Sequence, residues 1–277
     1  MITWQTDFYR RPLQQDGQPV WELVICCPEA EFLVHAFCRQ SDANSAWLTA
    51  QLETILQHHH RPDEIQVFRP QSLSLLVAAA QPLDISVAAT RRTRLLKAHL
   101  QDRIGVYQSM EGYTGEAYQP SAVESLPPVP LPEHLQGEQW RFGAIAAGDL
   151  MTFIEETPIP IRSAPAALHP LSLKLPSDLP IPGVVIDAGR QSMRLAQWLQ
   201  EQDPVCLSYI PGAPDGLILE AGLSDRWVMA TFEDEVVSQA GQTFQRRCQR
   251  SRGLHFLLVQ PDDSGVTYSG LWLQQPA

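Results

Sequence analysis

The sequence predicts an α/β protein of two domains with mixed sheets. Segments of strand type alternate with segments of helical periodicity along the whole chain, and two proline-dense passages interrupt this alternation. A chain of 277 residues is also long enough for two domains of ordinary size. We therefore expect an N-terminal domain over residues 1–119, a proline-rich linker over 120–136 and a C-terminal domain over 137–277.

The sequence of the N-terminal domain predicts the element order βββαβαβα, which is that of ribonuclease-H-like folds. Three strands come first, and an Asp16-Gly17 hairpin turn joins the first two, while Pro12 should end the first of them. Apolar residues at helical spacing then mark a helix, after which strands and helices alternate. The predicted elements are strands at 2–11, 19–27 and 31–38, a helix at 45–59, a strand at 64–68, a helix at 71–80, a strand at 85–89 and a helix at 91–103.

The sequence of the C-terminal domain predicts a mixed sheet with short helices. Alternating or fully apolar runs bounded by Pro, Gly and Asp mark the strands, and apolar residues at helical spacing mark the helices. Residues 157–182 lack clear element signals, so we expect an extended path over the surface. The predicted elements are strands at 139–147, 183–187, 204–210, 217–222, 226–232, 254–260 and 268–274, and helices at 150–155, 190–200 and 233–250.

The junction of the last strand and helix of the N-terminal domain, ISVAATRRTRLLK (85–97), is the most informative stretch. Thr90 can cap a helix that begins at Arg91, which places Arg91, Arg92 and Arg94 in its first turn. Cations at the positive end of a helix dipole cost roughly a few tenths of a kcal/mol each. An anion on the free N–H groups removes that cost, so the stretch predicts a phosphate clamp. Three solvated arginines at a surface turn explain the pattern equally well.

Basic residues also stand beside aromatic residues at other strand ends, in Tyr9-Arg10-Arg11 and Phe68-Arg69. If the sheet order is ribonuclease-H-like, the fourth and fifth strands end at one edge, so Arg69 lies near the arginines at 91–94. Single-stranded RNA is bound by cations on its backbone and aromatic faces on its bases, although aromatic residues in strands more often belong to the core. The predicted RNA-binding residues are Arg91, Arg92, Arg94, Arg69, Arg10 and Arg11.

Charge and composition limit the classes of partner. The net charge of −11 argues against sequence-independent adhesion to nucleic acid, so any RNA site must be a local basic patch. No apolar run can cross a bilayer and the first residues lack a signal-peptide core, which predicts a cytoplasmic protein without a membrane span. Five cysteines without a CxxC pair indicate no zinc site, and no glycine-rich phosphate loop occurs, so we expect neither metal nor cofactor.

Two alternatives to RNA binding stay open. A metal-dependent nuclease could use Asp7 on the first strand and Glu22 on the second, but the fourth and fifth strands end in arginine and supply no further carboxylates. We therefore predict no catalytic residue, and leave open whether Asp7 retains a metal. The other alternative is a protein-interaction scaffold that uses the proline-rich passages as docking surfaces.

Nine segments in order resemble the Tab/Atab RNA-binding family and together cover nearly the whole chain. They include DFYRRPL (7–13), ATRRTRLL (89–96), IPGVVIDAGRQSMRLAQWL (181–199) and LILEAGLSDRWVMATF (217–232). Members are chloroplast translation activators of a photosystem I subunit and their cyanobacterial relatives. The resemblance implies a non-catalytic protein of photosynthesis that binds the 5′ untranslated leader of photosystem I mRNA and promotes translation.

The partners that the resemblance implies are a single-stranded, A/U-rich mRNA leader and proteins of translation or photosystem assembly. The absence of a transit peptide fits a cyanobacterial, cytoplasmic member. The family closes on Trp-Leu-Leu, where this chain has Trp272-Leu273-Gln274, which leaves the role of that segment open.

Overall fold

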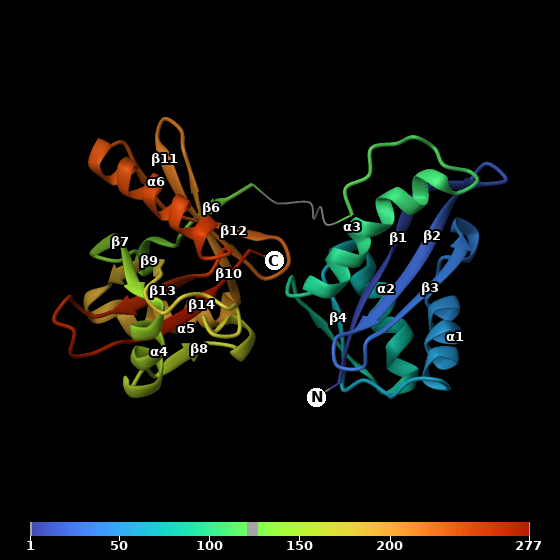
Figure 1. Ribbon diagram of the computed structural model, residues 1–277, viewed down its shortest axis with the longest axis horizontal. Coiled ribbons are helices and arrows are strands. Elements are labelled where there is room, and N and C mark those ends of the chain that lie inside the picture. Colours follow the sequence, from blue (N-terminus) through green and yellow to red (C-terminus); the bar gives the residue numbers. More distant parts are fainter. Residues whose placement is uncertain (1, 121–126, 277) are drawn as a thin grey trace. The chain divides into compact units, whose positions relative to one another are not determined.

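A five-stranded mixed sheet organises the first half of the chain (Figure 1). The computed structural model of the protein describes residues 2–120 and 127–276. The chain divides into two units, residues 1–124 and residues 125–277, which we call unit 1 and unit 2. Both are α/β with mixed sheets, so the predicted fold class is confirmed at this level.

Unit 1 consists of three strands followed by alternating helices and strands. The turn between its first two strands has Asp16 and Gly17 at positive φ, as an Asp-Gly hairpin turn requires. The strand order is β3-β2-β1-β4-β5, in which β1, β4 and β5 are parallel. The elements are β1 (Thr3–Gln15), β2 (Gln18–Cys27), β3 (Phe32–Arg39), α1 (Ser45–Leu56), β4 (Glu64–Val67), α2 (Pro70–Ala80), β5 (Ser86–Ala89) and α3 (Arg94–Ser109).

Helices cover both faces of this sheet. Side chains alternate between the faces along each strand, so Leu23 packs with α1 and α2 while Val24 packs with α3. The core on the first face includes Leu52 and Leu76, and the smaller core on the second includes Leu100. The buried polar residues Asp7, Arg11 and Glu22 also lie on the α3 face, next to this smaller core.

The prediction that Pro12 ends the first strand is wrong. β1 continues to Gln15 because its register with β2 shifts between Arg10 and Gln14, and Pro12 lies within that irregularity. A proline is tolerated there, since its missing N–H removes no regular ladder hydrogen bond.

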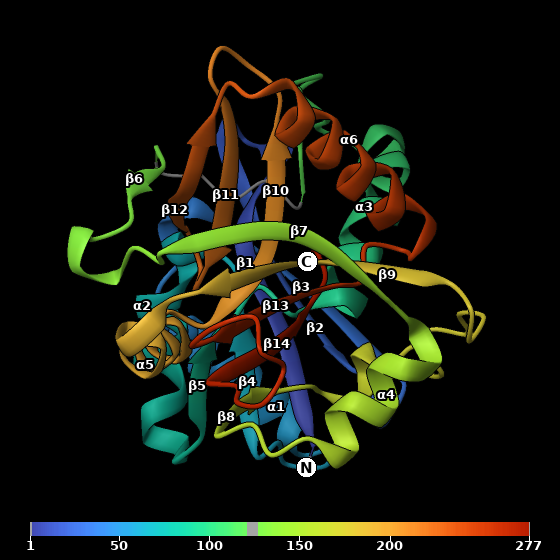
Figure 2. The same cartoon turned by 90° about the vertical axis from the view of Figure 1, so that its left-hand side faces the viewer.

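Unit 2 contains two sheets, ordered β10-β11-β12-β6 and β7-β9-β13-β14-β8. In Figure 2 the strands β10, β11 and β12 run across the direction of β7 and β9. Most predicted strands and helices are present within a few residues. The elements are β6 (Val129–Pro130), β7 (Gln139–Ala146), α4 (Ala147–Glu156), β8 (Ile161–Ser163), β9 (Pro180–Asp187), α5 (Ser192–Gln202), β10 (Pro204–Ile210), β11 (Asp215–Ala221), β12 (Asp225–Phe232), α6 (Glu235–Arg250), β13 (His255–Gln260) and β14 (Gly270–Gln274).

The main core of unit 2 joins its two sheets. Leu207 and Leu219 from the first sheet pack with Leu257 and Trp272 from the second, and Phe244 of α6 completes this cluster. Trp272 is 2% exposed on β14, which pairs with β13 and β8. The C-terminal segment whose role the sequence left open therefore builds the core.

The proline-dense passages contain more structure than their composition indicates. Within the predicted linker, Leu131 and Leu135 are buried in the core of unit 2. The linker bounds stay a prediction, and residues 121–126 of it lie outside the described residues. In the passage 157–182, β8 pairs in parallel with β14. In the described parts of the chain, no helix combines the length and the apolar character that a membrane span needs.

Candidate nucleic-acid interface

The carboxyl ends of three parallel strands meet at one edge of the sheet in unit 1. Thr6 of β1 pairs with Val67 of β4, which pairs with Ala89 of β5. The residues that follow each strand's paired segment therefore lie side by side, and the N–H of Thr90 donates to the Val67 carbonyl over 2.9 Å. The adjacency of the fourth and fifth strands, on which the predicted convergence of Arg69 and the 91–94 arginines rested, is confirmed. We call this region the carboxyl edge.

Cations and aromatic rings alternate along the carboxyl edge. The guanidinium carbon of Arg69 lies 4.1 Å from the centre of the Tyr9 ring and 5.0 Å from that of Phe68. On the other side, Lys97 Nζ lies 5.1 Å from the Phe68 ring centre and donates to the Arg91 carbonyl over 2.8 Å. The edge thus presents cation–π pairs from three different elements.

The expectation that α3 begins at Arg91 with Thr90 as its cap is wrong. The Thr90 hydroxyl accepts a hydrogen bond from the Arg92 N–H over 3.1 Å, and Thr93 N–H donates to the Arg91 carbonyl, so a turn precedes the helix. The helix begins at Arg94. Arg91 and Arg92 therefore lie before its first turn.

The start of α3 is also less open to an anion than expected. Its Leu96 N–H, one of the donors that a helix start leaves unpaired, donates to Gln5 Oε1 over 3.1 Å. One N–H group that could bind a phosphate at the helix start is therefore already paired with β1. An anion at this edge would be bound by side chains more than by the N–H groups of the helix.

The six predicted arginines fall into two groups by exposure. The exposed group is Arg10, Arg92 and Arg94. The buried group is Arg11, Arg69 and Arg91. Contact of any of them with RNA stays a prediction, and the exposed group is the one that a phosphate in solution can approach.

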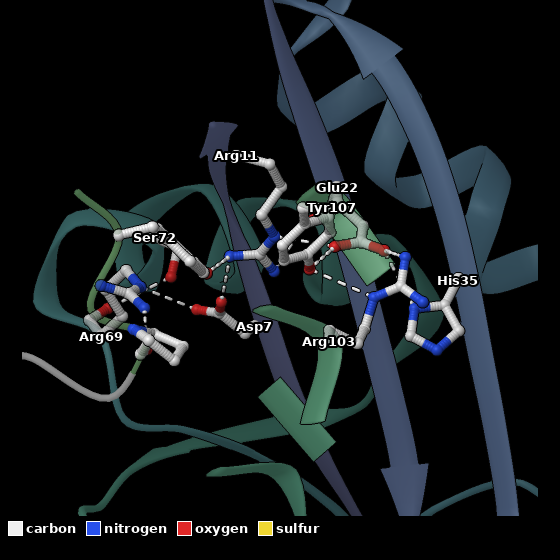
Figure 3. Close-up of polar contacts among 10 residues, drawn as sticks. Asp7, Arg11, Glu22, His35, Arg69, Ser72, Arg103 and Tyr107 are labelled. Atoms are coloured by element: carbon white, nitrogen blue, oxygen red, sulfur yellow. Dashed lines mark hydrogen bonds and ion pairs between the residues drawn. The ribbon is translucent and has the colours of Figure 1, made fainter. Parts of the chain in front are cut away.

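Arg11 and Arg69 converge on the carboxylate of Asp7 (Figure 3). Arg11 Nη1 donates to Asp7 Oδ2 over 3.0 Å, and Arg69 Nε donates to Asp7 Oδ1 over 2.8 Å. Asp7 and Arg11 share one face of β1, since they are four residues apart on a strand. Arg69 reaches them from the position before α2, where Pro70 begins the helix and keeps Arg69 extended.

Glu22 of β2 is the second buried carboxylate on this face. Its Oε2 accepts from Arg11 Nε over 2.8 Å and from the Tyr107 hydroxyl of α3. Its Oε1 accepts from Arg103 of α3 and lies 3.0 Å from His35 Nδ1 of β3. Both oxygens of Glu22 and both oxygens of Asp7 therefore accept a hydrogen bond from a side-chain donor.

The segment before residue 121 closes the cluster from outside. The Tyr118 hydroxyl accepts from Arg11 Nη1 over 2.6 Å, and the Pro120 carbonyl accepts from Arg69 Nη2 over 2.7 Å. The N–H of Thr114 donates to the Pro12 carbonyl, which fastens the same segment to β1. We call the connected side chains the buried cluster, and they are Asp7, Arg11, Glu22, Arg69, Arg103, Tyr107 and Tyr118.

The buried cluster keeps the Glu22 carboxylate charged and its phenols neutral. Burial alone would raise the pKa of Glu22, but hydrogen bonds from His35 and Tyr107 and the charge of Arg11 lower it to about 2. Burial alone would lower the pKa of Arg11, but the carboxylate of Asp7 together with Tyr118, Tyr107 and Glu22 more than compensates, so the pKa of Arg11 is raised. Burial raises the pKa of Tyr118 to about 12. The cluster is therefore a compensated ion-pair network at neutral pH.

The nuclease alternative would need Asp7 and Glu22 to bind a divalent cation. Each of their oxygens already has a donor, and three of these donors are guanidinium groups that a metal would have to displace. Over residues 2–120 and 127–276, no three His, Cys, Asp or Glu side chains form a group that could hold a metal ion. The geometry supports a structural role for both acids.

A cavity of about 280 Å³ lies beside the buried cluster. Its wall contains Tyr9, Arg10 and Arg11 of β1, Arg69 before α2 and Gln71 in its first turn. Residues 116–119 complete the wall. The cavity therefore joins the carboxyl edge to the segment that closes the cluster.

Sequence reasoning missed the part of the site that α3 and the closing segment supply. The sequence predicts that the helix ends at residue 103, whereas α3 continues to Ser109 and so includes Tyr107, and Tyr118 lies in a segment for which the sequence predicts no role. Tyr118 is 107 residues from Arg11 along the chain, so no local pattern announces their contact. The available signal was the pair of acids on β1 and β2, which needed cations to be buried.

Comparisons with known proteins match both halves of the chain. The family described as RNA-binding protein Tab2/Atab2 N terminal matches residues 3–103, and the family described as RNA-binding protein Tab2/Atab2, C-terminal domain, matches residues 118–275. The chain is 28% identical to a protein of Arabidopsis thaliana named Protein TAB2 homolog, chloroplastic, over 98% of this chain and 73% of that protein. A protein of the same name from Zea mays is 27% identical over 98% of this chain and 70% of that protein.

Among solved structures, a chain in the cryo-EM structure of a simian T-cell lymphotropic virus intasome in complex with PP2A regulatory subunit B56 gamma is similar to part of this chain. The match covers 51% of this chain and 64% of that chain, at 13% identity and a TM-score of 0.27. A likeness at this level supports no statement about fold or function.

Proposed function

The chain belongs to the Tab2/Atab2 family of RNA-binding proteins, and on that premise we propose that it binds a single-stranded, A/U-rich mRNA leader without cleaving it. The proposed target is the 5′ untranslated leader of a photosystem I mRNA, and the proposed effect is to promote its translation. The proposal places this activity in the cytoplasm. Proteins of translation or photosystem assembly are its further proposed partners.

The observation that carries the proposal is the grouping of cations and aromatic rings at the carboxyl edge. Strand β1, the turn after β4 and helix α3 bring Tyr9, Phe68, Arg69 and Lys97 into cation–π contact in a chain whose net charge is −11. Phe68 and Arg69 are themselves buried, and the half-buried Tyr9 and Lys97 form the aromatic and basic surface that suits the bases and backbone of a single strand. Arg92 and Arg94 extend this surface into solvent beside it.

The arrangement of unit 1 supports a ribonuclease-H-like scaffold that has no nuclease chemistry. Its three antiparallel strands precede two parallel strands and their helices, as the sequence predicts. The acids on its first two strands, Asp7 and Glu22, are neutralised by guanidinium groups. We therefore assign unit 1 to binding and no residue to catalysis.

Filter binding of the full chain to an A/U-rich single-stranded RNA tests the proposal. The double variant Arg92→Ala/Arg94→Ala should weaken binding and reduce the slope of log K against log salt by about 0.7 for each phosphate that is no longer bound. The control is Arg190→Ala/Arg194→Ala, which removes two exposed arginines from unit 2. Equal affinity and salt slope in the two double variants would refute the proposed interface. A wild-type chain that retains no RNA would refute the function.

A further inference from the structure

The cavity beside the buried cluster has the size and lining of a subsite for one nucleotide. Its volume of about 280 Å³ lies just below the range of about 300–1,000 Å³ that is usual for small-ligand pockets. It therefore suits one small planar group with a phosphate better than a larger cofactor. All ten residues of its wall belong to the described part of unit 1.

One wall of the cavity is a fixed cationic surface. Arg69 stacks on Tyr9 at 4.1 Å while Asp7 and the Pro120 carbonyl hold its guanidinium, and Arg11 beside it is held by both buried acids. These arginines have little conformational freedom left to lose when a ligand enters, because the ion pairs already fix their side chains. Arg69 is 3% exposed, so a planar base reaches this pair through the half-buried Tyr9 ring, which also lines the cavity.

The rim of the cavity supplies the groups that a nucleotide needs besides stacking. Arg10 is exposed and lines the cavity, so its side chain can move onto a phosphate. Gln71 is exposed in the first turn of α2, and its amide offers a donor and an acceptor to a base edge. The positive end of the α2 dipole lies at the same point and favours an anion there.

We propose that this cavity takes one unstacked nucleotide of the bound RNA, its base against the Tyr9 ring that Arg69 holds in place and its phosphate at Arg10. The inference rests on the proposed function and adds a defined subsite to it. The strand would run from the cavity along the carboxyl edge towards Arg92 and Arg94. The ligand class is a ribonucleoside monophosphate unit within a single strand.

A substitution that fills the cavity tests this while every proposed ligand-binding side chain stays in place. Ala117 is exposed and lines the cavity, so Ala117→Trp should block it. Ala78→Trp adds the same ring at an exposed position of α2 outside the cavity wall. Both full-length variants are measured by filter binding to A/U-rich RNA and by calorimetric titration with uridine and adenosine monophosphates, and their circular dichroism is compared with that of the wild-type chain.

We expect the wild-type chain and Ala78→Trp to bind both the RNA and a mononucleotide. Ala117→Trp should lose the mononucleotide and weaken RNA binding about tenfold, as for the loss of one stacked base. If all three proteins bind the RNA equally, or if the wild-type chain binds the RNA but neither mononucleotide, the subsite is refuted and the proposed function stands. If the wild-type chain does not bind the RNA, the proposed function is refuted and the subsite with it.

Discussion

Replacing Arg11 by alanine should be among the most damaging single substitutions in unit 1. Among the described residues, the change leaves Asp7 with Arg69 alone and removes one donor from Glu22, and both carboxylates are 0% exposed in the native chain. Removing one partner of a buried ion pair costs about 3–5 kcal/mol, because the remaining charge is uncompensated in a medium of low polarity. We expect a loss of unfolding free energy of that size.

Hydrogen exchange measured by mass spectrometry can assign this loss to one unit. Peptides from β1 and β2 should exchange at least about a hundredfold faster in Arg11→Ala, since each 1.4 kcal/mol changes an opening equilibrium about tenfold. Peptides from β13 in unit 2 serve as the internal reference. Arg10→Ala is the matched control: Arg10 is the exposed neighbour, and the change should alter the unfolding free energy by less than about 0.5 kcal/mol.

The pairing itself is tested by a double-mutant cycle. Arg11→Ala combined with Glu22→Gln should cost less than the sum of the two single changes, because the second substitution removes a charge that the first left unpaired. The reasoning is refuted if Arg11→Ala costs less than about 1 kcal/mol, or if the two costs simply add.

Acid should weaken the two units in different pH windows. Burial lowers the pKa of His255 to about 4, so the unfolded chain binds a proton there that the native chain does not, and unit 2 should lose up to about 3 kcal/mol as the pH falls from about 6.5 to 4. The pKa of Glu22 is lowered to about 2, so the unfolded chain binds a proton there first, and unit 1 should lose a similar unfolding free energy as the pH falls from about 4.5 to 2. Gly183→Ala should cost about 1–3 kcal/mol, since its Cβ would lie 2.4 Å from the Phe256 ring, whereas Gly143→Ala in the paired strand meets nothing closer than 3.8 Å and should be tolerated.

Urea unfolding at a series of pH values, followed by unit-specific hydrogen exchange, measures the two acid effects. His255→Gln should flatten the upper window and Glu22→Gln the lower one, and an unchanged pH profile in either variant would contradict the assignment. Thermal unfolding compares the two glycine variants, and equal melting temperatures would show that the Phe256 ring yields at no cost.

The fold could be predicted wherever its cause is local in the chain. The Asp16-Gly17 turn sets the first hairpin, because two successive residues at positive φ favour that pair. The strand at 204–210 was predicted with its observed bounds because a proline begins it and another follows it. The start of α3 was placed three residues too early, since Thr90 can either cap a helix or close a turn with Arg92, and only the surrounding chain decides between them.

The candidate site could be predicted only in part, because its ion pairs join distant segments. The sequence pattern predicts which arginines stand at strand ends, and the observed sheet order brings three of those ends together. The pattern could not show that Arg11 and Arg69 are bound to Asp7, since Arg69 is 62 residues away from that acid along the chain. A buried carboxylate on a strand requires a cation, but the sequence does not say which of eighteen arginines supplies it.

Ultraviolet crosslinking of the full chain to a 4-thiouridine-labelled, A/U-rich single-stranded RNA, with the crosslinked peptides identified by mass spectrometry, tests the central claim most directly. Binding at the carboxyl edge predicts crosslinks in peptides that contain residues 9–12, 68–71 and 91–97. Crosslinks confined to unit 2, or distributed over unit 1 without regard to this edge, would contradict it.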